Sequence, residues 1–290
     1  MASSILRKIV KGLFVLYSIK KLFDKIKSKI ALPKTKAPTP EKQKTDDSKP
    51  KIHPWRSCPI GSHWVVTHPL RVPPSKKRPG YITSRDGHCA DNPYRSKNKV
   101  VPDYLSRSEI HKISNEYFSQ LTGSPKADAL GFPDGNKYDV FIRGWTKYWN
   151  EVLKPSDPLD PDFVKALIAS ESNFKLKPPP PDAGIGGKAH GLMQLTDQTI
   201  SIIDNPKGEL RNHLVEFDYK DISDPVIVIC AGIRWLFYKK EFRERKVKEN
   251  ISWLAAAMEY KAFTKLLEKG DPKAIEQRDV LLMYYERLKK

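Results

Sequence analysis

The sequence predicts a mainly α-helical fold, preceded by a small β-containing module and a basic N-terminal arm. Three observations predict it. Apolar residues recur at helical spacing from Ser106 onward. Short β-type segments around a proline-rich turn occupy the region before it. The positive charge is concentrated at the N-terminal end, because residues 1–112 hold 25 Lys and Arg against 8 Asp and Glu, whereas residues 113–290 hold 27 against 26.

The first 32 residues predict a basic amphipathic helix. Its apolar face carries Leu6, Ile9, Leu13 and Leu16. The longest uncharged run, residues 12–19, is too short to span a bilayer, and no small-x-small cleavage site follows it. We therefore expect residues 5–32 to lie on an anionic membrane surface. A solvent-exposed or partner-binding helix and an uncleaved signal anchor are the alternatives.

Residues 33–54 are rich in Pro, Lys, Thr and Asp and predict a disordered spacer. Residues 55–103 predict a small basic β module. Its segments 63–68 and 80–83 have the composition of short strands, and a turn of sequence Pro-Pro-Ser-Lys-Lys-Arg-Pro-Gly joins them. The module is either a structural appendage or a binding site for glycan or an anionic polymer. Its lysine-rich neighbours lack interleaved aromatic residues, so we do not expect nucleic acid as a partner.

The three cysteines divide into two groups. Cys230 lies in an apolar run and predicts a buried free thiol. Cys58 and Cys89 fall together in the basic module and would form a disulfide in an exported protein. Reduced thiols are a second possibility. A zinc site with His63, His68 and His88 is a third, although the spacing matches no zinc module and no metal is expected.

Residues 104–290 predict one helical domain. Helices are expected at 106–118, 139–153, 161–172, 197–204, 224–244, 251–269 and 272–288. This region shows no internal repeat, no glycine-rich phosphate loop and no Ser-His-Asp constellation. Phosphoryl transfer and serine-hydrolase chemistry therefore have no support in the sequence, and no cofactor is expected.

Glu171 is the acid that the helical pattern singles out. Asp160 and Pro161 predict the start of its helix, as N-cap and first residue. Glu171 shares a face with the apolar stripe of Val164, Leu167 and Ile168. Burial and the negative end of the helix dipole both predict a raised pKa, which a general acid working near neutral pH requires. The alternative is a solvated Glu at a fraying helix end.

Several segments around this acid resemble the soluble lytic transglycosylase family of lysozyme-like enzymes. They are Glu171-Ser172-Asn173-Phe174, Gly191-Leu192-Met193-Gln194-Leu195 with Thr199, the apolar helix after Asp224-Pro225, and the alanine-rich segment 253–262. The resemblance covers roughly residues 157–268. The chain departs from the family at Lys261, where Asn is usual, and at Phe263, where Gly is usual.

This resemblance implies a lysozyme-like catalytic domain that acts on peptidoglycan glycan strands in the bacterial cell envelope, facing the periplasm or the wall. Glu171 would protonate the oxygen between N-acetylmuramic acid and N-acetylglucosamine. Its carboxylate would then take the proton of the attacking muramic 6-hydroxyl, and a 1,6-anhydro sugar would form. The substrate-binding residues would be Ser172, Gly191, Leu192, Met193, Gln194 and Tyr260. For Met193 and Tyr260, burial in the core is the alternative.

Two other functions stay open on the sequence. A lysozyme-type hydrolase would need a second carboxylate, for which Asp182, Asp197 and Glu259 are the candidates. We expect Asp182 to belong to a turn and Asp197 to cap the helix that follows it. The second alternative is a module without catalytic activity that binds wall glycan through the same cleft.

Overall fold

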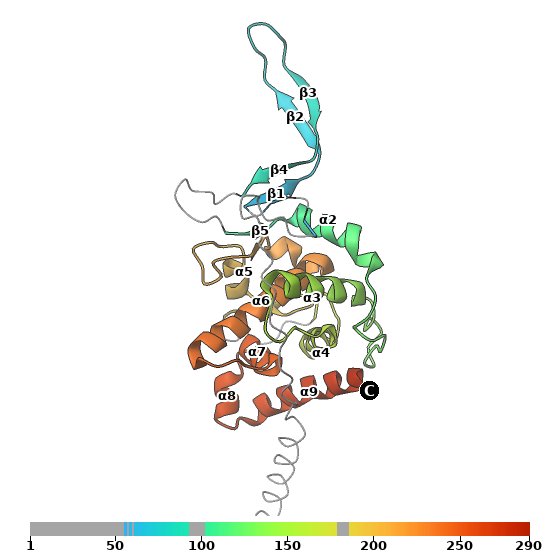
Figure 1. Cartoon of the computed structure of the whole chain (residues 1–290), viewed down its shortest axis with the longest axis vertical. Helices are drawn as coiled ribbons and strands as arrows, with labels where there is room; N and C mark the ends of the chain where they lie inside the picture. The colour runs from blue at the N-terminus through green and yellow to red at the C-terminus, as the bar shows by residue number, and fades with distance from the viewer. Residues whose placement is uncertain (1–54, 57, 60, 93–101, 179–185) are drawn as a thin grey trace, which may run out of the picture. The chain divides into compact units, whose positions relative to one another are not determined.

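The structure is a computed structural model that describes residues 55–56, 58–59, 61–92, 102–178 and 186–290 (Figure 1). The predicted amphipathic helix at 1–32 and the spacer at 33–54 lie outside the described residues. Mainly helical architecture with short strands toward the N-terminal side confirms the predicted fold class. Within the described part of the chain, no helix combines the length and the apolar character that crossing a bilayer requires.

Helices account for most of the region after residue 106. The α-helices are α2 (Arg107–Tyr117), α3 (Asp139–Leu153), α4 (Pro161–Ser172), α5 (Asp197–Ile202), α6 (Pro225–Val247), α7 (Trp253–Tyr260), α8 (Thr264–Glu268) and α9 (Pro272–Lys289), with short 3-10 segments at Phe118–Gln120 and Tyr219–Ser223. Two of their starts follow the sequence signals directly. The Asp160 side chain accepts a hydrogen bond from Asp162 N at the start of α4, and Asp224 caps α6 in the same way.

The strands are short and pair two by two. They are β1 (Ser62–Val65), β2 (His68–Val72), β3 (Tyr81–Arg85), β4 (His88–Asp91), β5 (Tyr104–Leu105), β6 (Ala189–His190), β7 (Leu195–Thr196) and β8 (Leu214–Val215). The pairs β1–β4, β2–β3 and β6–β7 are antiparallel, whereas β5–β8 is parallel.

Helix α6 is the centre of the helical region. Every residue from Ile227 to Tyr238 is buried, as expected for a helix surrounded by protein on all sides. It packs against α2, α3 and α7, while α4 packs between α3 and α9 (Figure 1). The indole Nε1 of Trp149 on α3 donates to the carbonyl of Cys230, with a donor–acceptor distance of 3.0 Å. Cys230 is a buried free thiol, as the sequence predicts.

The predicted helix at 251–269 is wrong in one respect, because it is broken into α7 and α8. Ala262 adopts a left-handed backbone with φ +59°. The backbone N–H of Phe263 donates to Met258 O, at 2.8 Å, across this turn. Such a turn satisfies the carbonyls at a helix end. No Gly or Pro marks it in the sequence, so the apolar pattern continues through it.

The predicted strand at 63–68 is also divided. β1 ends at Val65, β2 begins at His68, and the proline-rich turn joins β2 to β3. The break is held by the backbone N–H of Gly87, which donates to Thr67 Oγ1 at 3.1 Å. A side chain at residue 87 would displace the Trp64 ring, because its Cβ would lie 2.4 Å from that ring.

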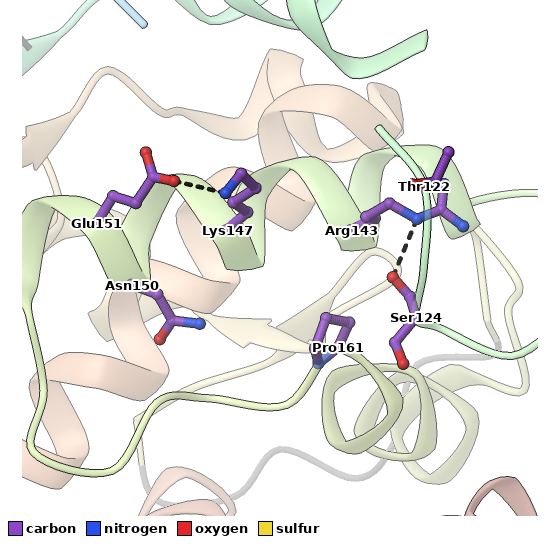
Figure 2. Close-up of a pocket in the computed structure, with 7 residues that line it drawn as sticks. All are labelled: Thr122, Ser124, Arg143, Lys147, Asn150, Glu151 and Pro161. Atoms are coloured by element: carbon purple, nitrogen blue, oxygen red, sulfur yellow. Dashed lines mark hydrogen bonds and ion pairs between the residues drawn. The ribbon is translucent and has the colours of Figure 1, made fainter. Parts of the chain in front are cut away.

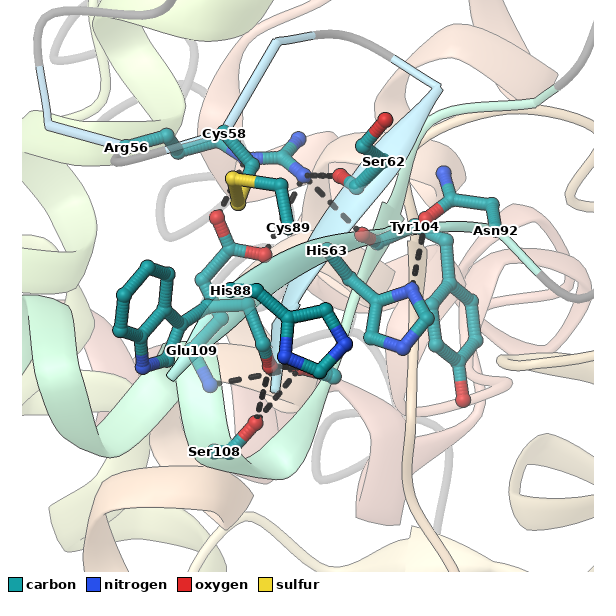
Figure 3. Close-up of a disulfide and its surroundings, with 12 residues drawn as sticks. Arg56, Cys58, Ser62, His63, His88, Cys89, Asn92, Tyr104, Ser108 and Glu109 are labelled. Atoms are coloured by element: carbon teal, nitrogen blue, oxygen red, sulfur yellow. Dashed lines mark hydrogen bonds and ion pairs between the residues drawn. A yellow bond between two sulfur atoms is a disulfide. The ribbon is translucent and has the colours of Figure 1, made fainter. Parts of the chain in front are cut away.

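A disulfide bond joins β4 to the segment that precedes β1 (Figure 3). Cys58 and Cys89, 31 residues apart, are bonded to each other. Of the three possibilities for this pair, the structure therefore has the disulfide. His63, one of the candidate zinc ligands, pairs instead with the side chain of Asn92, 3.2 Å from Nδ1 to Oδ1.

Arg56 links the β module to the helical region (Figure 3). Its buried guanidinium binds the carboxylates of Asp103 and Glu109, with 2.8 Å between Arg56 Nε and Glu109 Oε1. It also donates to the carbonyl of Ser62. The contact with Glu109 crosses the domain boundary predicted between residues 103 and 104. The boundary itself stays a prediction.

Candidate active site

Glu171 lies in the last turn of α4, next to a buried apolar stripe. Val164, Leu167 and Ile168 have no exposed surface, and the Glu171 side chain is 11% exposed. Directly after the helix, Asn173 and Phe174 both adopt left-handed backbone, and the Phe174 ring is buried. The chain therefore turns sharply behind the acid and fixes the position of the helix end that carries it.

The second segment of the site is the turn from Gly191 to Gln194, which joins β6 to β7. Gly191 has φ +68°, and a Cβ there would lie 3.0 Å from the carbonyl oxygen of Ile222. Glycine is therefore required at this position for conformational freedom and for close packing against protein. Gln194 is half-buried, and its Nε2 donates back to Gly191 O at 2.8 Å.

The two residues in the middle of this turn are core residues. Leu192 and Met193 have no exposed surface. Met193 packs on Gly232 of α6 so closely that a Cβ at residue 232 would lie 2.7 Å from Met193 Cγ. For Met193 the sequence left burial in the core as the alternative to sugar binding, and the structure shows this burial. What Met193 presents to its neighbours in the site is its backbone carbonyl.

Tyr260, at the end of α7, contacts this turn. Its hydroxyl donates to Met193 O. Burial raises the pKa of the Tyr260 phenol well above its usual value, and the negative charge of Glu171 adds to this rise. The Tyr260 hydroxyl is thus bonded to the 191–194 turn, and the charge of Glu171 acts on it.

Lys261 makes the most direct contact with the acid. Its Nζ lies 3.0 Å from Glu171 Oε1, and the lysine side chain is only 4% exposed. Glu171 Oε1 is buried and accepts no aligned hydrogen bond from the residues that the structure describes, so the contact is an ion pair. The sequence marks Lys261 as a departure from the family but does not predict this contact.

Ser172, the neighbour of the acid, is turned toward its own helix. Its side chain is almost fully buried, and its hydroxyl donates to Ile168 O at 3.3 Å. Such bonding to the carbonyl four residues earlier is common for serine within helices. In this conformation the hydroxyl of Ser172 is occupied inside the protein.

Asp197 does not cap α5, contrary to the sequence-based expectation. Thr196 is the N-cap, and its hydroxyl accepts a hydrogen bond from Thr199 N. The Asp197 carboxylate instead accepts from Lys188 N at 2.8 Å, pairs with His190 at 2.7 Å and accepts from the Tyr219 hydroxyl. These bonds, that of His190 first, lower the pKa of Asp197. Both carboxylate oxygens are thus bonded within the protein.

The other two candidate carboxylates are placed differently. Glu259 is half-buried on α7. Burial lowers the pKa of Lys239 on α6, and the charge of Glu259 opposes this effect. Glu259 is therefore close enough to act electrostatically on Lys239. Asp182 lies outside the described residues.

The comparison with protein families identifies the region that contains these segments. A family model described as the transglycosylase SLT domain matches residues 149–268. This stretch of the chain is similar to an SLT domain. The matched residues run from the end of α3 to the end of α8 and include every site residue that the sequence predicts. No curated protein and no solved structure matches the chain.

The SLT match confirms the resemblance found in the sequence. SLT domains belong to the lytic transglycosylases, which act on peptidoglycan glycan strands. Contacts link three segments far apart in the sequence: Lys261 at the end of α7 pairs with Glu171 at the end of α4, and Tyr260 of α7 bonds to the 191–194 turn. The contacts of Lys261 and Tyr260 and the packing of Met193 on Gly232 are features that the sequence pattern alone did not indicate.

A separate pocket of about 310 Å³ lies between α3 and the start of α4 (Figure 2). Pro161 lines it, and Glu171 follows ten residues later, about 15 Å along the same helix. Its polar groups are bonded within the protein: Arg143 Nε donates to Ser124 O at 3.0 Å, and Lys147 pairs with Glu151 at 2.7 Å. None of the predicted site residues lines this pocket.

Proposed function

We propose that the SLT domain of this protein is a lytic transglycosylase that cleaves the β-1,4 bond between N-acetylmuramic acid and N-acetylglucosamine. The observation that carries this proposal is one largely buried carboxylate, Glu171, inside the matched region. Its ion-pair partner Lys261 follows Tyr260, whose hydroxyl bonds to the 191–194 turn. A carboxylic acid protected from bulk water can deliver a proton to a bound sugar. The product would end in 1,6-anhydro-N-acetylmuramic acid.

In this mechanism Glu171 acts twice. As the acid it gives its proton to the glycosidic oxygen, and the bond from that oxygen to the anomeric carbon breaks. As the carboxylate it then accepts the proton of the muramic 6-hydroxyl, whose oxygen forms the new bond to the anomeric carbon. The nucleophile belongs to the substrate, so its attack benefits from proximity. One carboxylate is then sufficient, whereas most glycosidases use two.

The surroundings of Asp197 support the lytic reaction over hydrolysis. The hydrogen bonds to the Asp197 carboxylate come from three different partners in the protein. A carboxylate engaged in this way is a poor nucleophile and a poor base for water. The Cys58–Cys89 disulfide supports a location in the cell envelope, because disulfides persist in oxidising compartments. Attachment to an anionic membrane surface through residues 5–32 is part of the proposal.

Lys261 places a buried cation beside the proposed acid. Its Nζ lies 3.0 Å from Glu171 Oε1, and its side chain is 4% exposed. The same ion pair would also suit a glycan-binding module in which Glu171 never transfers a proton.

The reaction type is tested by mass spectrometry of the products from purified peptidoglycan. We expect anhydro-muramic ends, and substantial remaining activity in Asp197→Ala. Reducing-end muramic acid as the only product, together with an inactive Asp197→Ala or Asp182→Ala variant, would identify a lysozyme-type hydrolase instead. Binding to peptidoglycan without any cleavage would identify a wall-glycan-binding module.

A further inference from the structure

The hairpin formed by β2, β3 and the turn between them, residues 68–85, carries positive charge without acidic residues. Its cations are Arg71, Lys76, Lys77, Arg78 and Arg85, and no Asp or Glu occurs between Gly61 and Arg85. Among the described residues, none of these five side chains forms an ion pair with a carboxylate. The charge is therefore available to an external anionic partner.

The same hairpin exposes large apolar side chains. Ile82 is 76% exposed and Tyr81 51% exposed, and Leu70 on the facing strand is also exposed. In the register of the two strands, Ile82 lies opposite Arg71 and Tyr81 lies opposite Val72. Apolar and cationic side chains are therefore neighbours at the end of the hairpin next to its turn.

The turn at the end of the hairpin is held in one conformation. Ser75 N donates to Arg78 O at 2.9 Å, and Arg78 N donates back to Ser75 O. Prolines at 73, 74 and 79 fix φ on both sides. A Cβ at Gly80 would lie 3.0 Å from Pro74 Cδ, so the two sides of the turn are in close contact. A preformed turn loses little conformational entropy when it binds.

We propose that this hairpin docks on an anionic lipid bilayer, with Lys76, Lys77 and Arg78 at the lipid phosphates and with Tyr81 and Ile82 in the interfacial layer. Basic residues next to a membrane are attracted to anionic headgroups, and the interface accommodates tyrosine and aliphatic side chains. A soluble polyanion would satisfy the cations equally well but would leave Ile82 and Tyr81 in water. The exposed apolar residues therefore favour a lipid bilayer over a soluble anionic polymer as the partner of the hairpin.

This contact is independent of the proposed catalytic reaction and of the membrane attachment expected for residues 5–32. It would give the protein a second membrane contact, formed by folded structure. Because the amphipathic segment can bind the same vesicles, sedimentation of the whole protein with lipid does not report on the hairpin. The experiment must report from the hairpin itself.

The test places an environment-sensitive fluorophore on Ile82→Cys in the full chain. The new thiol can be labelled selectively, because Cys58 and Cys89 are bonded to each other and Cys230 is buried. We expect a blue shift of emission with phosphatidylglycerol vesicles and little change with phosphatidylcholine vesicles. The same fluorophore on Met283→Cys, which is 56% exposed on α9, should show no shift.

Charge reversal supplies the second arm of the test. Lys76→Glu, Lys77→Glu and Arg78→Glu together should abolish the blue shift of the label at residue 82. Vesicle sedimentation without a shift at residue 82, or a shift that survives charge reversal, would overturn the proposal. An equal shift with inorganic polyphosphate would also overturn it, since it would identify a surface for soluble polyanions.

Discussion

Glu171→Gln should lower the rate of peptidoglycan cleavage by about a hundredfold or more, as expected when general acid catalysis is lost. The amide keeps the shape of the side chain but has no proton to transfer and no basic oxygen to accept one. Both halves of the proposed reaction need the carboxyl group. Glu171 is largely buried beside Lys261, so we do not expect bulk water to take over its role in proton transfer.

The measurement is digestion of purified peptidoglycan, with thermal unfolding to show that the variant is folded. Glu268→Gln is the matched control, because Glu268 is an exposed acid that pairs only at the surface with Arg243. It should retain full activity. Near-normal turnover by a folded Glu171→Gln variant would remove Glu171 from the catalytic role and reopen the assignment of the acid.

Arg56→Met should lower the free energy of unfolding by about 3–5 kcal/mol, the usual loss when one partner of a buried ion pair is removed. The Arg56 side chain is 1% exposed and binds two buried carboxylates, those of Asp103 and Glu109. Methionine fills the space but leaves both carboxylates without their cation. The measurement is urea denaturation of both proteins at neutral pH.

Lys137→Met provides the control for this prediction, since Lys137 pairs with Asp134 at 3.6 Å and both side chains are about half exposed. An exposed pair of this kind contributes roughly 0–1 kcal/mol. If the two variants lost the same small amount of stability, the buried cluster at Arg56 would not hold the β module to the helices as inferred.

The Arg56 cluster also predicts a dependence of stability on acid. Burial alone would raise the pKa of Asp103, but the His213 hydrogen bond and the Arg56 charge lower it to about 2. Because this pKa lies below that of the unfolded chain, Asp103 stabilises the fold at pH above about 4. That contribution is lost as the pH falls toward 2. In Arg56→Met this acid-dependent loss should be smaller.

The sequence by itself determined the start of α4 and the face on which Glu171 lies. Asp160 and Pro161 begin the helix through local hydrogen bonding and a fixed φ. Helical periodicity then places Glu171 on the buried stripe. The free, buried Cys230 follows in the same way from its apolar run. These features depend on residues close together in the chain, so the pattern contains the information.

The tertiary structure alone decided what surrounds the acid. The ion pair of Lys261 with Glu171 joins residues 90 positions apart, and it depends on the helix end before Ala262. Met193 is buried because α6 offers Gly232 beneath it. Such contacts depend on how helices pack and on where a backbone turn becomes favourable. Hydrophobic periodicity and capping residues do not contain information about helix packing or about the position of such a turn. Only the packed structure could therefore determine these contacts.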